Sequence, residues 1–416
     1  MGILQEVYEA LYQCNKCGFC QATCTTYRNL WDETYATRGR LRLILAVADG
    51  ALERTSAYEE AINTCLTCHQ CAVTCPSGIK GDELILAARR DLYEKHGFPL
   101  NKKIALQRVL PYRERRNMAF AAFRLLRGLL PATFRGIDVK GMPVARKSFI
   151  DSTFEVHRAG DKPAGRVAYF VGCMTDHTLP EVAEAVIRVL LANNIEVVVP
   201  KKQECCGLPM YTYGDVETAR GLAKKNMEVF RTFKVDHVLT ACGSCGGMLR
   251  TNYPQIFAGT GEEKTAEEFS AQVMDISEYL WDKLQINGQD LGYLSLTVTY
   301  HDSCHLARGM GVTKQPRKIL QSIPGIKFVE MREADQCCGA AGLFQGLYPE
   351  LSNKITANKI NNAKETGADI VAVECPACLH RIQGGINSNK TGQKAVHLVE
   401  ILAAAYQKVD SLKLAR

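Results

Sequence analysis

The 416-residue chain has no uninterrupted apolar run long enough to cross a bilayer. Residues 1–6 resemble neither a secretory signal peptide nor, without Ser or Thr at position 6, an N-myristoylation site. A G-x-G-x-x-G after a predicted strand, a Walker phosphate loop, a nucleophile elbow and an H-E-x-x-H helix are all missing. The sequence therefore predicts a protein of a reducing interior such as the cytoplasm, which binds neither flavin nor NAD itself.

Nucleic acid is not an expected partner, because the chain lacks aromatic stacking platforms and a recognisable binding module. Its formal charge of +7 is uneven: residues 101–150 hold twelve Lys or Arg against Glu114 and Asp138, which is +10 and leaves −3 elsewhere. One interpretation of this segment is a solvated, irregular linker. The other is a peripheral membrane contact or a docking surface for an acidic partner. It rests on the apolar residues that accompany Arg124 and Arg127, namely Met118, Phe120, Phe123, Leu125, Leu126, Leu129 and Leu130.

What the chain does have is eighteen cysteines in ordered groups. Eight form two copies of the spacing C-x2-C-x2-C-x3-C, the second followed by Pro76 and the first by Thr25. This spacing holds cubane [4Fe–4S] clusters, with the fourth cysteine of each run serving the other cluster. We expect two such clusters, held by Cys14, Cys17, Cys20, Cys24, Cys65, Cys68, Cys71 and Cys75.

The other ten cysteines form a second duplication. Each copy has a lone cysteine, a Cys-Cys-Gly triplet 32 or 33 residues later, and a Cys-x-x-Cys pair 36 or 37 residues after the second triplet cysteine. Five soft thiolates around one object indicate a metal–sulfur site. The first set is Cys173, Cys205, Cys206, Cys242 and Cys245, and the second set is Cys304, Cys337, Cys338, Cys375 and Cys378.

Disulfides, zinc and inert burial account for these cysteines less well. Disulfides need an oxidising compartment, and cysteine makes up only about 4% of the chain, which is too dilute for a disulfide scaffold. Zinc ribbons use separated Cys-x-x-Cys pairs rather than three cysteines in succession. Inert buried cysteines have no reason to repeat at fixed intervals. The spacing therefore favours iron–sulfur sites.

Secondary-structure patterns divide the chain into helical and alternating parts. Residues 5–13 and 38–48 carry apolar positions at helical spacing around the eight N-terminal cysteines. From residue 166 onwards short strands alternate with helices, which predicts parallel sheets with sites beyond the carboxyl ends of the strands. Helices are expected at 179–192 and 215–233, and strands that each precede a cysteine group at 167–171, 196–199, 237–240, 296–300, 327–330 and 370–373.

Several residues beside the cysteines have more than one interpretation. Gly207 and Gly339 follow the paired cysteines and permit the sharp turn that adjacent thiolates need. For each nearby histidine a hydrogen-bonded loop residue competes with a ligand or proton relay, and Asp302 and Glu374 are expected to cap or orient loops. Arg38 and Arg40 could tune a cluster potential, although surface solvation is the expected role. The histidines are His177, His301, His305 and His380.

Eight ferredoxin-type cysteines followed by two copies of Cys…Cys-Cys-Gly…Cys-x-x-Cys form a known arrangement. The chain resembles the iron–sulfur subunits of glycolate, lactate and anaerobic glycerol-3-phosphate dehydrogenases, and the catalytic subunit of heterodisulfide reductase. The resemblance covers nearly the whole chain. It implies an α-helical ferredoxin domain at 1–98, a basic connector at 99–165, and a duplicated α/β pair of CCG domains, parallel and Rossmann-like, at 166–290 and 291–416.

The resemblance also implies ligand sets. It places Cys14, Cys17, Cys20 and Cys75 on one cubane and Cys65, Cys68, Cys71 and Cys24 on the other. In heterodisulfide reductases each five-cysteine set holds a noncubane [4Fe–4S] cluster at which a disulfide is cleaved, so one or two further clusters are implied. Members on the glycolate oxidase side often lack some of these cysteines, whereas this chain has all ten.

The leading hypothesis is an electron-transfer subunit of a 2-hydroxyacid dehydrogenase complex of the glycolate or D-lactate type. Because the chain has no hydride-handling cofactor of its own, a partner subunit with FAD would oxidise the substrate. Electrons would then pass to a quinone, an electron-transfer flavoprotein or another carrier. One alternative is a heterodisulfide-reductase-like subunit that reduces a disulfide. Another is an electron conduit in a larger respiratory or bifurcating complex.

Overall fold

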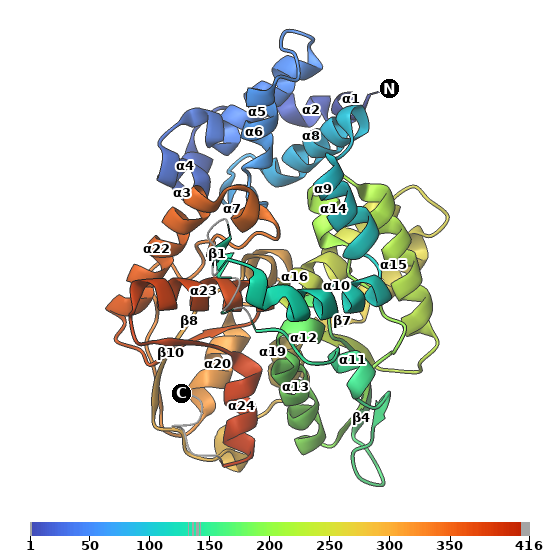
Figure 1. The fold of residues 1–416 in the computed structure, drawn as a ribbon, viewed down its shortest axis with the longest axis vertical. Helices are drawn as coiled ribbons and strands as arrows, with labels where there is room; N and C mark the ends of the chain where they lie inside the picture. Colours follow the sequence, from blue (N-terminus) through green and yellow to red (C-terminus); the bar gives the residue numbers. More distant parts are fainter. Residues whose placement is uncertain (1, 132, 135–136, 139–140, 142, 409–416) are drawn as a thin grey trace.

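The computed structural model describes residues 2–131, 133–134, 137–138, 141 and 143–408. Helices of the N-terminal part lie at one end, and two sheet-containing units lie side by side beneath them (Figure 1). We call these the first unit, built on strands β4–β7, and the second unit, built on β8–β11. Arg135 and Lys140 of the basic segment and the last eight residues of the expected 291–416 domain lie outside the described residues.

The N-terminal part is helical, as predicted. The expected helix at 38–48 is confirmed as α5, which packs against α8 through a small apolar core that includes Ile44 and Ile85. The expected helix at 5–13 is instead split at Val7, whose φ of −109° and ψ of 7° let both Leu4 and Leu11 reach that core. The helices are α1 Ile3–Glu6, α2 Tyr8–Tyr12, α3 Phe19–Thr23, α4 Thr25–Leu30, α5 Thr37–Ala48, α6 Ser56–Asn63, α7 Gln70–Thr74 and α8 Gly81–His96.

The expected connector is more regular than an irregular linker, so that interpretation is wrong for residues 100–129. The reason is compositional: residues 113–126 contain no Gly or Pro and are rich in Arg, Ala and Leu, which favour helix. The segments are α9 Leu100–Lys103, the π-helical η2 Ile104–Val109, α10 Arg113–Leu126, η3 Arg127–Leu129, the antiparallel pair β1 Thr133–Phe134 and β2 Ile137–Asp138, and α11 Phe149–Ser152.

The first unit is a five-stranded sheet of order β3-β5-β4-β6-β7, in which β3 is antiparallel and the rest are parallel. The strands are β3 Val156–His157, β4 Gly165–Phe170, β5 Ile195–Val198, β6 His237–Thr240 and β7 Val273–Asp275. The end of the expected connector therefore adds an edge strand to this sheet. Its helices are α12 Cys173–Thr178, α13 Pro180–Ala192, α14 Leu208–Thr212, α15 Val216–Arg231, α16 Gly243–Gly247, η4 Met248–Asn252, α17 Tyr253–Phe257, α18 Glu263–Ala271, α19 Ile276–Glu278 and η5 Tyr279–Lys283.

The second unit is a four-stranded parallel sheet of order β11-β10-β8-β9. Apart from the edge strand β3, the strands of each sheet lie side by side in the order second, first, third and fourth strand of that unit along the chain. The duplication in the cysteines is therefore also a duplication of the sheet. The predicted parallel sheets are confirmed. The elements are η6 Gly288–Asp290, β8 Leu296–Tyr300, η7 His305–Gly309, α20 Lys314–Ser322, β9 Ile326–Phe328, α21 Phe344–Leu347, α22 Pro349–Glu365, β10 Ile370–Val373, α23 Pro376–Asn389, β11 Lys394–His397 and α24 Leu398–Tyr406.

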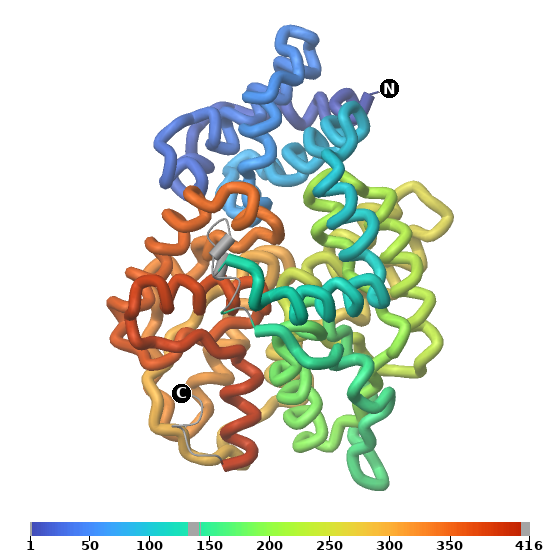
Figure 2. The backbone as a smooth tube through the Cα atoms, in the orientation of Figure 1, coloured from blue at the N-terminus to red at the C-terminus, as the bar shows by residue number. Residues whose placement is uncertain are grey.

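One apolar core extends through both units. It includes β4 and β10, whose last four residues are fully buried, as expected for parallel strands covered by helices on both faces. Helix α13 of the first unit packs against α24 of the second. The backbone trace shows the two units meeting along their length, with the N-terminal helices over one end (Figure 2). The two units are thus packed directly against each other.

Candidate metal centres

The two N-terminal cysteine runs have the same backbone geometry. Lys16 and Thr67 occupy equivalent positions and have φ of 56° and 47°, while Gly18 and His69, also equivalent, have φ of 85° and 62°. Left-handed backbone is costly for residues other than glycine and collects at functional sites. Its repetition in both runs shows two loops folded alike, each with its first three cysteines on one tight turn.

These loops surround two separate cavities. The outer site, a cavity of about 420 Å³, is lined by Cys14, Cys17, Cys20 and Cys75, and also by Cys71. The inner site, a cavity of about 340 Å³, is lined by Cys24, Cys65, Cys68 and Cys71. The structure thus brings the fourth cysteine of each run to the first three of the other run. Cys17 is exposed to solvent, whereas Cys71 is buried.

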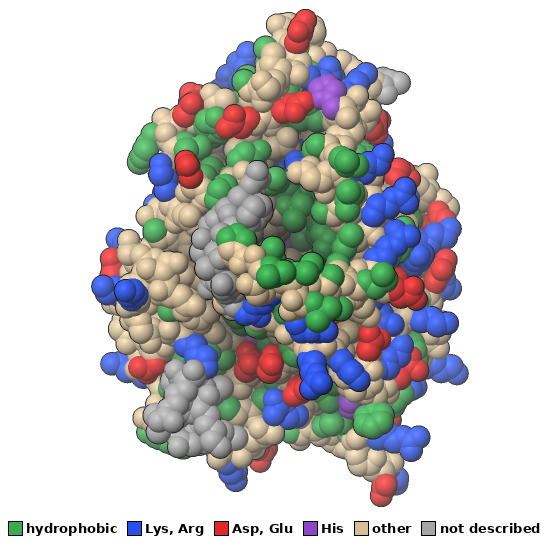
Figure 3. Space-filling view, viewed as in Figure 1, with side chains coloured by type: hydrophobic (Ala, Val, Ile, Leu, Met, Phe, Trp, Pro, Cys, Tyr) green, Lys and Arg blue, Asp and Glu red, His purple; other side chains and the backbone are tan. Residues whose placement is uncertain are grey.

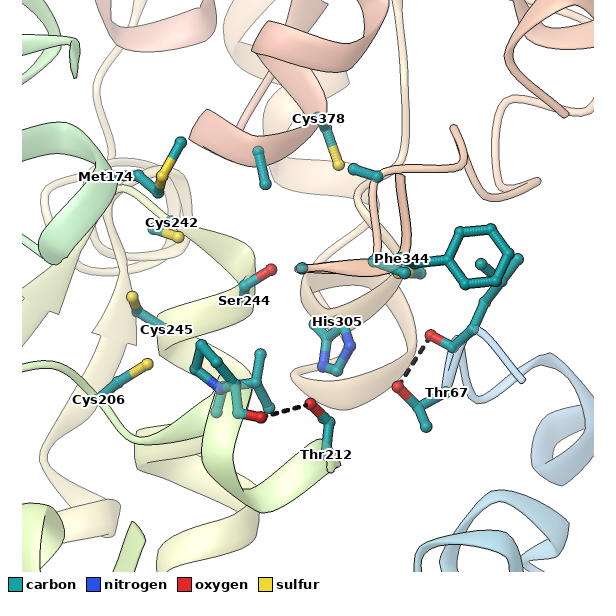
Figure 4. A pocket seen from close by; sticks show the side chains of 18 of the residues that line it. Thr67, Met174, Cys206, Thr212, Cys242, Ser244, Cys245, His305, Phe344 and Cys378 are labelled. Carbon is teal, nitrogen blue, oxygen red and sulfur yellow. Dashed lines mark hydrogen bonds between the residues drawn. The ribbon is translucent and has the colours of Figure 1, made fainter. Parts of the chain in front are cut away.

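A third, larger cavity lies where the N-terminal helices meet the two units. The empty space within it, including open solvent at its mouth, is about 1070 Å³. Figure 3 shows a hollow bordered by hydrophobic side chains at this place. In Figure 4, Cys206, Cys242 and Cys245 lie on one side, Cys378 lies opposite, and Ser244 and His305 lie between them. The cysteines that line it are all those of the first set, four of the second set (Cys304, Cys337, Cys338 and Cys378), and Cys65 of the inner site.

Within each set the thiols interact in the same order. In the first set the order is Cys173, Cys205, Cys206, Cys245, Cys242, with 3.9 Å between the Sγ atoms of the first two. In the second set it is Cys304, Cys337, Cys338, Cys378, Cys375. The thiols of Cys242 and Cys375 also interact with each other. The ten cysteines therefore form two equivalent groups that meet at one point.

In the two duplicated sets each cysteine group follows a strand, as predicted, although the Cys-Cys pairs begin seven residues after β5 and nine residues after β9. Cys173, Cys205 and Cys242 follow the carboxyl ends of β4, β5 and β6, and the second set follows β8, β9 and β10 in the same way. Gly207 and Gly339 have φ of 92° and 89°, which confirms that the turn after each Cys-Cys pair needs glycine. The parallel strand ends thus gather each set on one edge of its own sheet.

The glycine-rich sequence of α16 lets the two edges meet, a role that the sequence patterns do not reveal. A Cβ atom on Gly243 would lie 2.7 Å from the Cβ of Leu306, closer than side chains can approach. With glycine there, the Gly243 N–H donates to the carbonyl of Glu374 at 2.9 Å, and Ser244 Oγ lies 3.3 Å from the Sγ of Cys375. The first set therefore contacts the loop that carries the second.

The protonation of these thiols shows that the sites fit a metal. Burial raises the pKa of the Cys68 thiol to about 12 and that of Cys71 well above its usual range. Hydrogen bonds from the thiols of Cys205 and Cys245 lower the pKa of Cys206 to about 5. Without metal, some thiols thus lose their proton only because neighbouring thiols keep theirs and donate hydrogen bonds to them. All of them can be thiolates together only with positive charge among them, which iron supplies.

Three arginines lie buried beside the inner site. Arg40 is 1% exposed, so the expectation of a solvated surface residue is wrong, because its guanidinium turns inward to hydrogen-bond acceptors. Arg89 is 3% exposed and donates to the carbonyl of Cys65, while the side chain of Arg308 is 7% exposed and donates to the carbonyl of Cys68 at 2.7 Å. No sequence pattern distinguishes the last two. Burying an ion costs several kcal/mol unless it is compensated.

The histidines do not behave alike. His380 accepts or donates a bond with Thr178 at 2.8 Å, and His177 stacks on Phe120, as ordinary buried rings do. The ring of His301 is different: it is 1% exposed, and neither nitrogen has a hydrogen-bond partner among the described residues. One of its nitrogens lies within 4.8 Å of the sulfurs of both Cys338 and Cys378. Burial lowers the pKa of His301 to about 3, so the ring is neutral and able to ligate.

Several contacts connect the inner site to the second unit. His69, which lies between two of its cysteines, is 2.5 Å from Asp82 and 3.4 Å from His305, the residue after Cys304. Arg308 adds the contact to Cys68 described above. A small apolar cluster that includes Leu66 and Cys337 covers the same junction. These contacts join the inner site to the loops of the second set.

Asp302 and Glu374 have structural partners. Asp302 forms a two-pronged ion pair with Arg317, with bonds of 2.7 and 2.8 Å, and Glu374 accepts a bond from the hydroxyl of Tyr300 at 2.8 Å. Burial raises the pKa of Glu374 well above its usual range. Both acids therefore orient the loops that precede or contain the second set, as expected.

Helix α10 and the short helix η3 that follows it expose apolar side chains on the surface. Met118, Leu125 and Leu129 are 72%, 82% and 85% exposed. Some cations of the segment are structural: Arg116 is buried 3.8 Å from Glu204, and Arg113 pairs with Asp151. Across the described ranges, every helix is too short or too polar to cross a membrane.

Comparison with known proteins agrees with this arrangement. Residues 10–79 match the family described as 4Fe-4S dicluster domain, and residues 167–250 and 298–383 each match the cysteine-rich domain CCG. The first match contains all eight cysteines of the outer and inner sites. The other two contain the five cysteines of each set.

Similar proteins cover the chain from end to end. The probable glycolate oxidase iron-sulfur subunit of Bacillus subtilis is 33% identical over 95% of this chain and 94% of that protein. One subunit of the fumarate reductase (CoM/CoB) of Methanothermobacter marburgensis is 32% identical over 94% of this chain and 72% of its own length. One subunit of the dihydromethanophenazine:CoB–CoM heterodisulfide reductase of Methanosarcina acetivorans is 28% identical over 95% of this chain and 94% of that protein. The chain thus belongs to the family of iron–sulfur electron-transfer subunits that join a 4Fe-4S dicluster domain to two CCG domains, as the glycolate oxidase iron–sulfur subunit does.

Proposed function

We propose that this chain is the iron–sulfur electron-transfer subunit of a flavin-dependent 2-hydroxyacid dehydrogenase complex that acts on glycolate or D-lactate. A partner subunit with FAD oxidises the substrate and passes single electrons to this chain. The chain delivers them to a quinone, an electron-transfer flavoprotein or another carrier. The observation that carries the proposal is the similarity to the glycolate oxidase iron-sulfur subunit, which extends over 95% of this chain and 94% of that protein.

We infer that the chain holds four clusters. The outer site, with Cys14, Cys17, Cys20 and Cys75, and the inner site, with Cys24, Cys65, Cys68 and Cys71, each hold a cubane. The first and second sets each hold a noncubane [4Fe–4S] cluster, and the identical order of thiols in the two sets is the reason for two rather than one. When bound, these groups supply one-electron chemistry. The protein contributes the ligands, excludes water from the inner site and fixes the spacing.

We also infer domain limits and a compartment. An N-terminal core of Leu4 to Leu92 supports a ferredoxin domain at 1–98, followed by the basic connector at 99–165. The strand order of each sheet supports Rossmann-like CCG domains at 166–290 and 291–416. Eighteen thiols that serve as iron ligands need a reducing compartment, for which we propose the cytoplasm.

Electrons from the partner enter at the outer site in this proposal. Cys17 is exposed, and Tyr12 and Phe19 beside it are 67% and 61% exposed, so a partner's surface can approach this site closely. The inner site is the next step, because Cys71 lines both cavities. From there the contacts of Arg308 and His69 lead to the second set.

Substrate-driven reduction of the complex tests the proposal. The chain is co-expressed with an FAD-containing oxidase, purified without oxygen and mixed with glycolate or D-lactate. We expect the cluster absorbance to bleach on the timescale of turnover. With Cys17→Ala in the outer site, the flavin should still be reduced while the clusters stay oxidised. If the isolated chain, supplied with artificial electrons, instead reduces disulfides rapidly and never associates with such an oxidase, the proposal is wrong.

A second function is favoured by one specific observation: both five-cysteine sets meet at a single cavity, which nine of the ten cysteines line. A disulfide bound in this cavity would lie beside both sets. In this alternative, two electrons from a partner and two protons from solvent convert RSSR′ into RSH and R′SH. Adding a heterodisulfide to the oxidised protein would then produce a new paramagnetic signal, which the dehydrogenase proposal does not predict. If the protein shows neither activity, the remaining interpretation is an electron conduit in a larger respiratory or bifurcating complex.

We further propose that α10 rests on an anionic membrane surface. The support is the exposed apolar row of Met118, Leu125 and Leu129 within a segment of charge +10. Vesicles with phosphatidylglycerol should retain the protein, and vesicles of phosphatidylcholine alone should not. The double change Leu125→Asp with Leu129→Asp should abolish binding. The control variant Tyr293→Asp alters an exposed side chain outside the basic segment and should leave vesicle binding unchanged. Equal binding to both vesicles would contradict the proposal.

A further inference from the structure

Three guanidinium groups lie around the inner site with almost no access to solvent. Arg40 lines the cavity itself together with the four inner cysteines. Arg89 lines the large cavity and donates to the carbonyl of Cys65, a residue that lines both cavities. Arg308 reaches the site from the second unit, through the carbonyl of Cys68. They come from three different parts of the chain, so their convergence is a property of the fold.

Their hydrogen-bond partners are almost all neutral. Arg40 donates to the carbonyl of Ala61 at 2.6 Å and to the hydroxyls of Thr26 and Thr64 at 3.2 and 3.1 Å. Arg89 donates only to carbonyls, those of Ile62, Asn63, Cys65 and Thr212. Neutral dipoles satisfy the N–H groups, but they leave the positive charge in place.

Arg308 is the least satisfied of the three. It also donates to the carbonyl of Asp335 at 2.9 Å, and the carboxylate of Asp335, half exposed, is 3.4 Å away. Its Nη2 is buried and has no hydrogen-bond partner among the described residues. It donates to the carbonyl of Cys68 and lies on η7, which begins directly after Cys304, so it lies between the inner site and the second set. An anion at either place would complete its environment.

Acidic residues compensate these cations only in part: Asp335 pairs with Arg308 at 3.4 Å, and no such ion pair is found for Arg40 or Arg89 among the described residues. The lining of the inner cavity includes one carboxylate, that of Asp82, and His69 binds it at 2.5 Å. The outer site differs in this respect. Its arginine, Arg38, is one-quarter exposed and pairs with Glu33 at 2.6 Å. Of the two N-terminal sites, the inner one is therefore the site with buried positive charge that carboxylates leave largely uncompensated.

We infer that Arg40, Arg89 and Arg308 are balanced by the negative charge of the inner cluster, and that they make the inner site accept electrons from the outer site. The inference rests on the proposed function, because it needs a cluster at each site. Reduction adds one negative charge to a cluster, and nearby buried cations stabilise that charge more strongly than cations in water do. Burial alone would act in the opposite direction, since it disfavours the more charged form. We expect the attraction between the three guanidinium charges and the added electron to outweigh the effect of burial on the reduction potential.

The inference gives the electron flow a direction, from partner to outer site, then inner site, then second set. Arg308 lies where the last transfer occurs, so it stabilises the electron on both sides of that step. It acts through charge on the clusters and is a positioning residue rather than a catalytic one. Reverse flow, from the duplicated sets towards the exposed outer site, would run against this arrangement.

Redox titration of the full chain, followed by electron paramagnetic resonance, tests the inference. The outer signal is first identified by Cys17→Ser, which changes its ligand field. In the wild-type protein the first electron should appear on the inner cluster. At a fixed ambient potential, Arg308→Gln and Arg40→Gln should each lower the ratio of reduced to oxidised inner cluster about tenfold, which is ~59 mV for one electron. Arg308→Lys should restore most of the ratio, and Arg38→Gln should leave the inner signal unchanged.

The two kinds of failure are distinguishable. If the protein contains no cubane signals and no matching iron, the proposed function fails and takes this inference with it. If both signals are present but the first electron resides on the outer cluster, or if Arg308→Gln keeps its iron and leaves the inner ratio unchanged, only this inference is overturned. The order of reduction in the wild-type protein decides the matter even if a glutamine variant does not fold.

Discussion

At the scale of single residues, the meeting of the two cysteine sets depends on Gly243. The residue gives the first unit room to approach Leu306, and its N–H joins the backbone beside Cys375. A methyl group at this position must displace the backbone of η7, which begins directly after Cys304. Position 243 therefore couples the stability of the interface to the spacing between the sets.

We expect Gly243→Ala to lower the free energy of unfolding by about 1–3 kcal/mol, the usual cost of overfilling a tightly packed site. The measurement is anaerobic denaturation of the iron-loaded protein, followed by circular dichroism. Gly221→Ala is the matched control, because it lies on α15 with open space around its Cβ and should be neutral or slightly stabilising. Equal behaviour of the two variants would contradict the close approach.

The arginines show where residue-scale prediction from sequence stops. Arginine is nearly always exposed, so the sequence predicts Arg40 at the surface, and nothing in it distinguishes Arg89 or Arg308. Each becomes notable only when the fold places it beside cysteines that lie far away in the chain. The cysteines themselves can be identified because their spacing repeats, which is information within the sequence.

At the scale of elements, helix α24 connects the two units. Its N-cap is His397, whose Nδ1 accepts a bond from Val399 N at 3.2 Å, and the side chain of Glu400 completes the capping box. The other ring nitrogen lies 2.9 Å from the carbonyl of Ala241, next to Cys242 in the first unit. Burial lowers the pKa of His397 to about 4, so the ring is neutral and Nε2 carries the proton it donates.

Removing the His397 cap should lower the free energy of unfolding by more than the loss of an ordinary N-cap does. We expect His397→Ala to reduce the free energy of unfolding by about 2–4 kcal/mol, since it loses both the cap and a buried partner for a carbonyl. Thr55→Ala removes an exposed cap from α6 and should cost about 1 kcal/mol. Chemical denaturation of both variants provides the comparison. A loss at His397 no larger than that at Thr55 would show that the bond between the units contributes nothing.

Most elements around the cysteines can be predicted, and the exceptions have physical reasons. Strands β6, β8 and β10 occupy the predicted residues because short β-branched runs stand between clear turns. The patterns do not predict β7 and β11, since β7 has three residues and β11 begins with a lysine, so neither has a recognisable alternation. The separation of α1 from α2 is a tertiary effect at Val7. The orientation of the two units, and with it the meeting of Cys242 with Cys375, depends on contacts between distant segments.

At the scale of the whole molecule, the sites hold the three parts of the chain together. The inner site shares Cys65 with the large cavity, which both units line. Buried thiols and buried guanidinium groups make these places unfavourable for a chain without metal. Iron binding and the association of the parts are therefore linked.

We expect removal of iron to loosen the whole molecule. Chelation under anaerobic, reducing conditions should lower the free energy of unfolding by several kcal/mol, on the order of 5 or more. Proteolysis of the iron-free chain should cut between the N-terminal helices and the sheet units, and iron with sulfide should restore resistance. An iron-free protein as resistant as the loaded one would show that the sites contribute little to the fold.

The proposed function depends above all on eighteen cysteines that ligate iron, in groups of four, four, five and five. Native mass spectrometry of anaerobically purified protein measures this iron content. We expect four [4Fe–4S] clusters, about 16 irons, and a loss of about four irons in each of the variants Cys206→Ala and Cys338→Ala. Eight irons or fewer in the intact chain, or sulfurs bound to zinc or to one another, would contradict the proposed function.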